Sequence, residues 1–318
     1  MILRLAHLVI AVDDLAAARE FYVDLLGFVE HERDSDTIYL RGVEEFDTWS
    51  LALTERGSAG LLHSAFRVSD PDDLDRLESL HEELGAKSLR LPAGAEPGQG
   101  EALRVLTPEG HVVEFVHELE EISPYDADGK LRLPMRNTHT NPGVPPARID
   151  HVSLRVPAVP DALPYWVDAL GFGVSEYWMT EDDIPHIAWV RRTTTTHDVA
   201  LGTNGVAAFH HFAYKVADPN ALLHAADLLG DARIPLQLEW GPARHGATNA
   251  FAMYIRDPAG NRLELFNGDY DRDLDRPPLY WRPGNYEIQG HSWWAYPPPP
   301  SFAESAPVLI EEAFPVGA

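Results

Sequence analysis

The sequence predicts an α+β fold made of four βαβββ modules, which are arranged in two tandem domains. Three observations lead to this prediction. Strand-like runs alternate with helix-like runs along the chain. The first half of the chain recurs in the second half, and each half contains the same strand–helix–strands unit twice. A chain of 318 residues is long enough for two domains of ordinary size.

The first module begins with a strand and a helix. Residues 4–12 have the apolar pattern of a strand with His7 near its middle, and the two aspartates that follow can cap a helix that ends at Gly27. Residues 148–156 repeat this strand with His151 at the same place, and the helix after them again ends in Leu-Gly-Phe. These two segments are therefore copies of one unit.

The second repeated segment carries another histidine, and the third carries a glutamate. His63 and His211 lie in strands that lead through Asp-Pro into a helix, whereas Glu114 and Glu264 lie in the second strand of a hairpin. The copies are 144 residues apart at the first histidine, 148 at the second and 150 at the glutamate. This nearly constant offset indicates duplication. If its face of the strand is buried, such a glutamate must be paired, protonated or bound to a cation.

The repeats divide the chain into four parts. We expect an N-terminal domain at 1–118, a linker at 119–147 that has turn residues and no periodicity, and a C-terminal domain at 148–268. The tail at 269–318 is rich in Pro, Tyr and Trp. It is too aromatic for a disordered segment, so we expect it to pack back over a domain as a cover for the site.

The composition excludes several kinds of function. The 25 basic and 50 acidic residues give a net charge of −25, which argues against nucleic acid or an anionic membrane as a partner. The absence of cysteine excludes disulfides, thiolate metal sites and cysteine nucleophiles. No apolar run approaches the roughly 20 residues that span a bilayer, and the first residues lack a signal-peptide cleavage pattern. We therefore expect a cytoplasmic protein.

The repeated residues of the second half form a candidate metal site. His151, His211 and Glu264 lie centrally in three strands, and paired modules that close into a cup would bring them together. Taken singly, each histidine is more simply explained as a buried core residue with a hydrogen-bond partner. Three such residues in equivalent module positions favour a metal site instead. Two imidazoles and one carboxylate are the facial triad of non-haem Fe(II) oxygen chemistry.

Five stretches carry a family resemblance that covers nearly the whole chain. They are RIDHVSLRV (148–156), AWVRRTTTTHDVAL (188–201), FHHFAYKV (209–216), GPARHGATNAFAMYIRDPAGNRLELF (241–266) and SWW (292–294). In these stretches the chain resembles the extradiol catechol dioxygenases of the vicinal oxygen chelate superfamily, and most of all their homoprotocatechuate 2,3-dioxygenase branch. The resemblance implies two tandem domains of the vicinal oxygen chelate type. It also implies that both atoms of O₂ are inserted into a catecholic small molecule beside its two hydroxyls, in aromatic compound degradation.

The resemblance also implies a role for each residue of the site. The three repeated residues would bind Fe(II), with Mn(II) as the alternative. His197 would act as acid and base, and His245 and Tyr254 would hydrogen-bond the reacting oxygens of the substrate. Trp189 would form a wall of the pocket. The family resemblance implies a homodimer or homotetramer, and it leaves open which metal is bound and whether cleavage is proximal or distal.

The chain departs from that branch at the positions that hold the carboxylate of the substrate. Trp240 stands at the position of one arginine of the branch, and the second arginine is also missing from its place beside His291. Ser153 replaces an asparagine. Losing a bidentate clamp is not a conservative change, so we expect a neutral or apolar-substituted catechol that contacts these three residues. Homoprotocatechuate 2,3-dioxygenase activity proper is the alternative.

The first half keeps a complete copy of the triad in His7, His63 and Glu114. We interpret it either as a remnant of the duplication in a structural domain or as a second metal site. Trp49 stands near the place of the catalytic histidine, and Arg104 stands in the place of the catalytic tyrosine. We therefore expect no ring cleavage in this half.

Two further classes of function compete with the dioxygenase. Glyoxalases and epimerases of the same superfamily use more carboxylates and lack the set His197, His245 and Tyr254. A protein that only sequesters a small molecule would lack a complete triad. We interpret His210 as a structural residue on the opposite face of the strand from His211, and we assign His186 no role other than as a candidate for the wall of the pocket.

Overall fold

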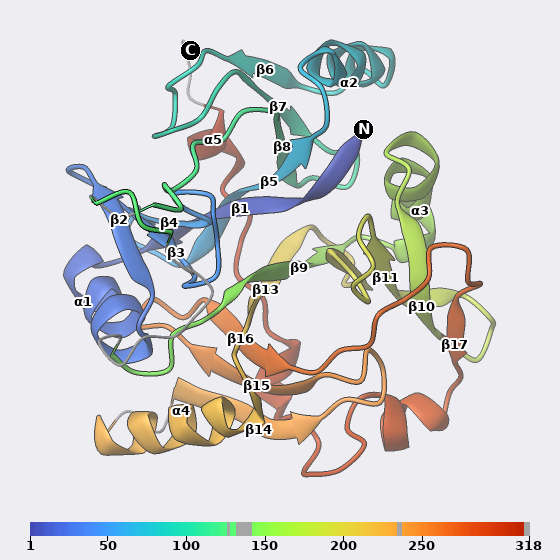
Figure 1. Cartoon of the computed structure of the whole chain (residues 1–318). Coiled ribbons are helices and arrows are strands. Elements are labelled where there is room, and N and C mark those ends of the chain that lie inside the picture. Colours follow the sequence, from blue (N-terminus) through green and yellow to red (C-terminus); the bar gives the residue numbers. More distant parts are fainter. Residues whose placement is uncertain (126–127, 132–141, 234–236, 315–318) are drawn as a thin grey trace.

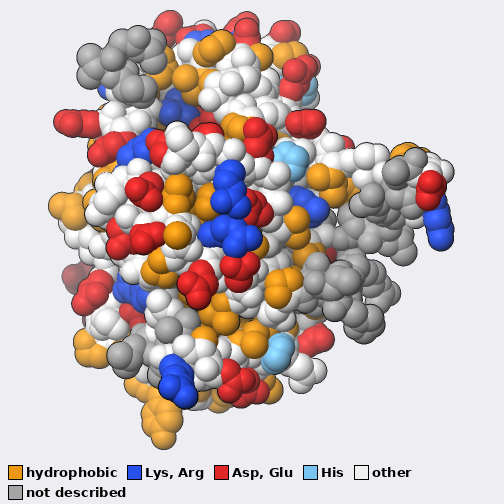
Figure 2. Space-filling view, turned by 90° about the vertical axis from the view of Figure 1, so that its left-hand side faces the viewer, with side chains coloured by type: hydrophobic (Ala, Val, Ile, Leu, Met, Phe, Trp, Pro, Cys, Tyr) orange, Lys and Arg blue, Asp and Glu red, His pale blue; other side chains and the backbone are white. Residues whose placement is uncertain are grey.

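The computed structural model describes residues 1–125, 128–131, 142–233 and 237–314. Within these ranges the chain forms two mixed β-sheets that lie side by side, with α-helices against them (Figure 1). None of the described helices is both long and apolar enough to cross a membrane. On the face shown in Figure 2, acidic side chains are scattered among fewer basic ones, in keeping with the net charge of −25.

The N-terminal sheet contains eight strands in the order β2-β3-β4-β1-β5-β8-β7-β6. In each of its two modules the first strand pairs in parallel with the last, and the modules join through the antiparallel pair β1–β5. The elements are β1 (Ile2–Val12), α1 (Leu15–Arg19), η1 (Glu20–Leu26), β2 (Val29–Arg33), β3 (Thr37–Arg41), β4 (Leu51–Glu55), β5 (Gly60–Val68), α2 (Asp72–Glu83), β6 (Ser88–Leu91), β7 (Ala102–Leu106) and β8 (Val112–Val116).

The C-terminal sheet repeats this topology in the order β14-β15-β16-β13-β9-β12-β11-β10-β17. Here the modules join through the antiparallel pair β9–β13. The elements are β9 (Arg148–Val156), α3 (Val159–Leu163), η2 (Pro164–Ala169), β10 (Gly173–Met179), β11 (Pro185–Arg191), β12 (Val199–Thr203), β13 (Ala208–Lys215), α4 (Pro219–Asp231), β14 (Leu238–Arg244), β15 (Phe251–Arg256) and β16 (Arg262–Asn267). The predicted α+β fold with four βαβββ modules in two tandem domains is confirmed.

Strands β1 to β8 and β9 to β16 lie within 1–118 and 148–268, whereas β17 of the second sheet belongs to the segment predicted as the tail. The N-terminal sheet ends at Val116 and the C-terminal one starts at Arg148. The predicted linker, 119–147, falls partly outside the described residues, which omit 126–127 and 132–141. Its described end packs on the first module, where the Val144 amide donates to the Leu26 carbonyl.

The tail crosses from the C-terminal sheet to the N-terminal one. Its strand β17 (Leu279–Trp281) pairs with β10, and η4 (Tyr286–Gly290), η5 (Pro300–Ala303) and α5 (Ile310–Ala313) follow. Between η5 and α5, Ala306 forms a bridge with Phe209, and Val308 forms one with Leu61. The tail thus contacts the second module of both domains (Figure 1).

Each domain buries one hairpin turn in the other domain. In the C-terminal turn, Asp257 accepts a hydrogen bond from the Tyr22 hydroxyl (2.9 Å), and the Asn261 amide donates to the Ala11 carbonyl (2.8 Å). The equivalent N-terminal turn carries Glu109, which accepts from the indole of Trp166 (2.5 Å). These paired contacts hold the two sheets together, and they leave Oε2 of Glu109 buried without a hydrogen-bond partner among the described residues.

Candidate functional site

Three adjacent strands of the C-terminal sheet bring the predicted metal ligands together. His151 lies on β9, His211 on β13 and Glu264 on β16, and all three are buried. The two Nε2 atoms lie 3.3 Å apart, and Oε2 of Glu264 lies 3.2 Å from the first and 3.1 Å from the second. Octahedral coordination with bonds of about 2.1 Å places neighbouring ligand atoms about 3 Å apart. The donor set and its spacing therefore fit one divalent metal ion.

An irregularity in strand pairing changes the position of His210. The register between β9 and β13 shifts between Phe209 and His211, so simple alternation of side chains fails here. Nδ1 of His210 lies 2.6 Å from Nδ1 of His211, and both rings line the same cavity. The interpretation of His210 as a structural residue on the opposite face was wrong, because a bulge interrupts the two-residue period that it assumed.

Both ligand imidazoles are oriented by a partner at Nδ1. The carboxylate of Asp150 accepts from Nδ1 of His151 at 3.0 Å. His210 must carry its proton on Nε2, because that atom lies 2.7 Å from the Phe302 carbonyl, which can only accept. Its Nδ1 then accepts from Nδ1 of His211. Both ligands therefore present an unprotonated Nε2 toward the metal position, which is the tautomer that metal binding requires.

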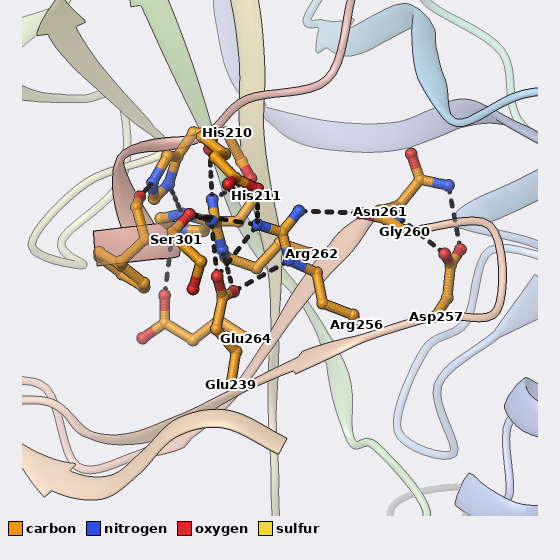
Figure 3. Close-up of polar contacts among 12 residues, drawn as sticks. His210, His211, Glu239, Arg256, Asp257, Gly260, Asn261, Arg262, Glu264 and Ser301 are labelled. Carbon is orange, nitrogen blue, oxygen red and sulfur yellow. Dashed lines mark hydrogen bonds and ion pairs between the residues drawn. The ribbon is translucent and has the colours of Figure 1, made fainter. Parts of the chain in front are cut away.

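The site opens into a cavity of about 390 Å³. Its walls include aromatic rings of the sheet, and the tail contributes the other side through Tyr286, His291, Pro298 to Pro300 and Phe302. Figure 3 shows how Arg262 ties the tail to the strands beside the site. Its buried guanidinium pairs with Glu239 (2.6 Å) and donates to the carbonyls of His210 (3.0 Å) and Ser301 (3.1 Å). The tail is therefore a fixed part of the cavity.

The three predicted catalytic residues surround the ligands. The ring of His197 lies 3.9 Å from that of His151 between centroids, and its Nδ1 is 3.0 Å from the hydroxyl of Thr196. Nδ1 of His245 donates to the carbonyl of His291 (2.6 Å), so its Nε2 accepts from the hydroxyl of Tyr254 (2.9 Å). All these side chains line the cavity.

Burial sets the protonation states of the catalytic residues. It lowers the pKa of His197 well below 6.5 and also lowers the pKa of His245, so both rings are neutral at physiological pH. Burial, together with the charge of Glu264, raises the pKa of Tyr254 well above 10 and keeps its hydroxyl protonated. The site therefore holds two neutral imidazoles and one phenol that can exchange protons with a bound molecule.

The structure places three of the four predicted substrate contacts in the cavity wall. Trp189, Ser153 and His291 line it. Trp240 is not among the lining residues. It stacks on the far side of Tyr254, with ring centroids 5.4 Å apart, and donates its indole N–H to the Tyr296 carbonyl (2.8 Å). Its position therefore stabilises the tyrosine instead of forming the wall.

Several lining residues escaped sequence reasoning. Arg155 is among them, as are the prolines of the tail, whereas His186 was a candidate for the wall and does line the cavity. Arg155 could have been found, because it lies four residues after His151 on β9 and side chains two and four apart share a face of a strand. The prolines could not, because no periodicity relates the tail to the site.

Comparison with known proteins decides the family. Residues 148–265 match the Glyoxalase/Bleomycin resistance protein/Dioxygenase superfamily, and residues 61–120 match the catechol 2,3-dioxygenase-like N-terminal domain. The chain is 32% identical to the manganese-dependent 2,3-dihydroxybiphenyl 1,2-dioxygenase of Geobacillus genomosp. 3, over 93% of this chain and 94% of that protein. The chain belongs to the extradiol ring-cleaving dioxygenases. A metapyrocatechase of Geobacillus stearothermophilus is 30% identical, with 91% and 89% covered.

Solved structures agree with this membership of the extradiol dioxygenases. Homoprotocatechuate 2,3-dioxygenase from Arthrobacter globiformis superposes with a TM-score of 0.89 at 35% identity, over 98% of this chain and 94% of that chain. The enzyme from Brevibacterium fuscum, in complex with 3,4-dihydroxyphenylacetate, gives 0.88 at 35% identity, over 98% and 94%. The predicted resemblance is confirmed, and the chain is a metal-dependent dioxygenase.

Proposed function

We propose that this extradiol dioxygenase opens a catechol ring beside its two hydroxyls and uses a divalent metal ion held by His151, His211 and Glu264. The observation that supports this most is the spacing of their three ligand atoms, 3.1–3.3 Å, at the wall of a cavity of about 390 Å³. Fe(II) and Mn(II) both suit two imidazoles and one carboxylate. The metal, when bound, lowers the pKa of the catechol hydroxyls and holds the two reactants close together.

Side chains of the site then accept and donate the protons of the reaction. His197 is neutral, and Thr196 can either donate to its Nδ1 or accept from it. Nε2 of His197 can therefore accept a proton from the substrate and later return one without moving the ring. Tyr254 and His245 form a hydrogen-bonded pair beside Glu264, in which the tyrosine donates to the imidazole and its oxygen can accept a hydrogen bond from a catechol hydroxyl. These roles disfavour an isomerase or a binding protein.

The polar end of the cavity bears on the choice of substrate. The predicted preference for a neutral or apolar catechol rested on the two missing arginines and on Trp240, and Trp240 does not line the cavity. Arg155 does line the cavity, and its guanidinium forms no hydrogen bond or ion pair with any described residue. It lies against Gly202, where an added Cβ would meet its Nη1 at 2.2 Å. Arg155 is half-buried, and its guanidinium is available to an acceptor in the cavity, so we infer a catechol whose substituent ends in an oxygen acceptor, such as a carboxylate.

The test is anaerobic reconstitution with Fe(II) or Mn(II), followed by an oxygen-electrode and visible-absorbance screen. The panel is catechol, 3- and 4-methylcatechol, protocatechuate and homoprotocatechuate, with His197→Phe as the control. Oxygen uptake with a yellow ring-fission product supports the proposed reaction. No uptake with any catechol by metal-loaded protein would favour an isomerase or a binding protein. For Arg155, Arg155→Met should raise KM for the acids and leave KM for 4-methylcatechol unchanged.

A further inference from the structure

A second group of possible metal ligands lies in the N-terminal domain. His7 lies on β1, His63 on β5 and Glu114 on β8, and the structure adds Glu96 from the loop between β6 and β7. All four ligand atoms lie within 4.8 Å of one another. Nε2 of His7 is 3.5 Å from Glu96 and 3.7 Å from Glu114, and Nε2 of His63 is 3.4 Å and 3.8 Å from the same two carboxylates.

The two histidines have no hydrogen-bond partner in the part of the chain that the structure describes. Their side chains are 0% and 1% exposed, and none of their four ring nitrogens is hydrogen-bonded. One carboxylate oxygen of Glu96, Oε2, is also without a partner. Buried polar groups are almost always satisfied, so two converging imidazoles without partners indicate a ligand between them.

The backbone presents this group in the same way as the proposed metal site of the other domain. The rings of His7 and His63 lie 5.6 Å apart between centroids at 78°, and those of His151 and His211 lie 5.4 Å apart at 78°. The carboxylates also match, because Glu114 and Glu264 are each paired in parallel register with an alanine two residues after the second histidine.

The residues around this group differ from those around the proposed metal site of the other domain. The ring of Trp49 covers His7 with 4.1 Å between centroids, which is the relation of His197 to His151. Arg104 pairs in register with Glu114, as Tyr254 does with Glu264. Glu96 comes from the loop equivalent to the one that carries His245. A fourth protein ligand with no open position is the mark of a structural metal site, as opposed to a catalytic one.

Nearby side chains hold both carboxylates in place. Arg104 donates to Oε2 of Glu114 (2.6 Å) and to Oε1 of Glu96 (3.0 Å), and Gln99 donates to Oε1 of Glu114 (2.9 Å). Two carboxylates and one guanidinium carry a net charge of −1, which attracts a cation to this position. Arg104 does not partner the imidazoles, because its guanidinium donates to Glu96, Glu114 and the Ala313 carbonyl instead. The guanidinium of Arg104 therefore does not take the place of a metal ion between the two imidazoles.

We propose that His7, His63, Glu96 and Glu114 bind a second divalent metal ion, preferentially Zn²⁺, which stabilises the N-terminal domain and takes no part in ring cleavage. Zn²⁺ prefers four nitrogen, oxygen or sulfur ligands in a tetrahedron, and bonds of about 2.0–2.1 Å put the ligand atoms about 3.3 Å apart. The histidine-to-carboxylate distances of 3.4–3.8 Å approach this spacing.

The test counts metal in a chain whose C-terminal site has been disabled. Glu264→Gln protein is stripped with a chelator and titrated with Zn²⁺ alone by calorimetry, and metal content is then measured after dialysis. We expect one equivalent per chain and a rise in Tm on adding Zn²⁺. Adding Glu96→Gln, which preserves the side-chain shape, or His63→Ala should remove both the equivalent and the Tm rise. Adding Glu101→Gln, an exposed residue of the same loop, should change neither.

Two results would overturn the proposal. The first is that Glu264→Gln protein binds no Zn²⁺ and shows no change in Tm. The second is that it binds one equivalent that survives both Glu96→Gln and His63→Ala, since the ion would then lie elsewhere. Circular dichroism of each variant before the titration identifies any variant that fails to fold. If His63→Ala does not fold, the result for Glu96→Gln decides. Because no substrate is used, the outcome does not depend on the proposed reaction.

Discussion

The two domains place two histidines and one glutamate on equivalent strands, yet they surround these residues differently. In the C-terminal domain the neighbours are His197, His245 and Tyr254, which line a cavity. In the N-terminal domain the equivalent places hold Trp49, Glu96 and Arg104, which are an apolar ring, a fourth ligand and a cation bonded to the carboxylates. The comparison teaches that the backbone supplies the triad, whereas the residues around it decide whether a substrate can enter.

The largest difference in turnover is expected between substitutions of the two glutamates, Glu264 and Glu114. Glu264→Gln should reduce turnover to the background level, because it removes the only carboxylate among the three proposed ligands. Glu114→Gln should leave kcat unchanged, because Trp49 and Arg104 take the places of the proposed catalytic histidine and tyrosine in that group. Steady-state oxygen uptake at saturating catechol measures both. Equal losses in the two variants would mean that both groups take part in the reaction.

The next largest difference in kcat is expected between substitutions of His197, which covers His151, and Trp49, which covers His7. His197→Phe should lower kcat by about 10²–10⁴-fold, which is the usual contribution of a positioned acid and base. Trp49→Phe keeps an aromatic cover over His7 and should not affect kcat. The measurement is kcat for metal-loaded protein with one catechol. A loss of less than about tenfold in His197→Phe would assign the proton transfer to another group.

The buried turns of the two domains should respond to pH. Burial raises the pKa of Asp257 from 3.8 to about 6, and hydrogen bonds from Asn261 and Tyr22 oppose this only in part. Asp257 therefore contributes stability that is fully present below about pH 4 and is lost as the pH rises through about 6, which amounts to about 3 kcal/mol. Urea unfolding between pH 4 and pH 7 should show a smaller pH dependence for Asp257→Asn than for the unmodified chain.

The equivalent turn of the N-terminal domain provides a matched comparison. Burial also raises the pKa of Glu109, whose carboxylate accepts from Trp166. The free energy of unfolding should therefore depend less on pH in Glu109→Gln than in the unmodified chain, as it should in Asp257→Asn. A pH dependence that neither variant changes would mean that other carboxyl groups are responsible for it.

The smallest expected effect concerns the partner of the second histidine. His210 orients His211, whereas the equivalent residue before His63 is Leu62. His210→Leu should weaken metal binding at the C-terminal site by about 10–100-fold, as loss of a partner that orients a ligand usually does. His186→Leu, which alters the cavity wall away from the ligands, should leave the affinity unchanged. Competition with a fluorescent chelator measures both, and equal affinities for the two variants would mean that His210 is not needed to orient His211.

The sequence was sufficient for the fold and for both triads because duplication repeated them. His151, His211 and Glu264 could be found through their copies, without any knowledge of contacts. Glu96 could not, because it lies in a loop whose residues follow no period. His210 was misplaced because a strand irregularity is not visible in the pattern. Trp240 was assigned to the cavity wall by its position in the chain, but stacking on Tyr254 turned it away.

The path of the tail has a consequence for how the enzyme is made. The Phe302 carbonyl positions His210, and the Ala313 carbonyl accepts from Arg104, so the tail touches the surroundings of both groups. These residues follow both domains in the chain, and domains fold in order as synthesis proceeds. A growing chain can therefore complete both sheets before it contains the tail residues that cover the cavity. Catalytic competence is acquired late in synthesis, after the chain has extended past residue 302.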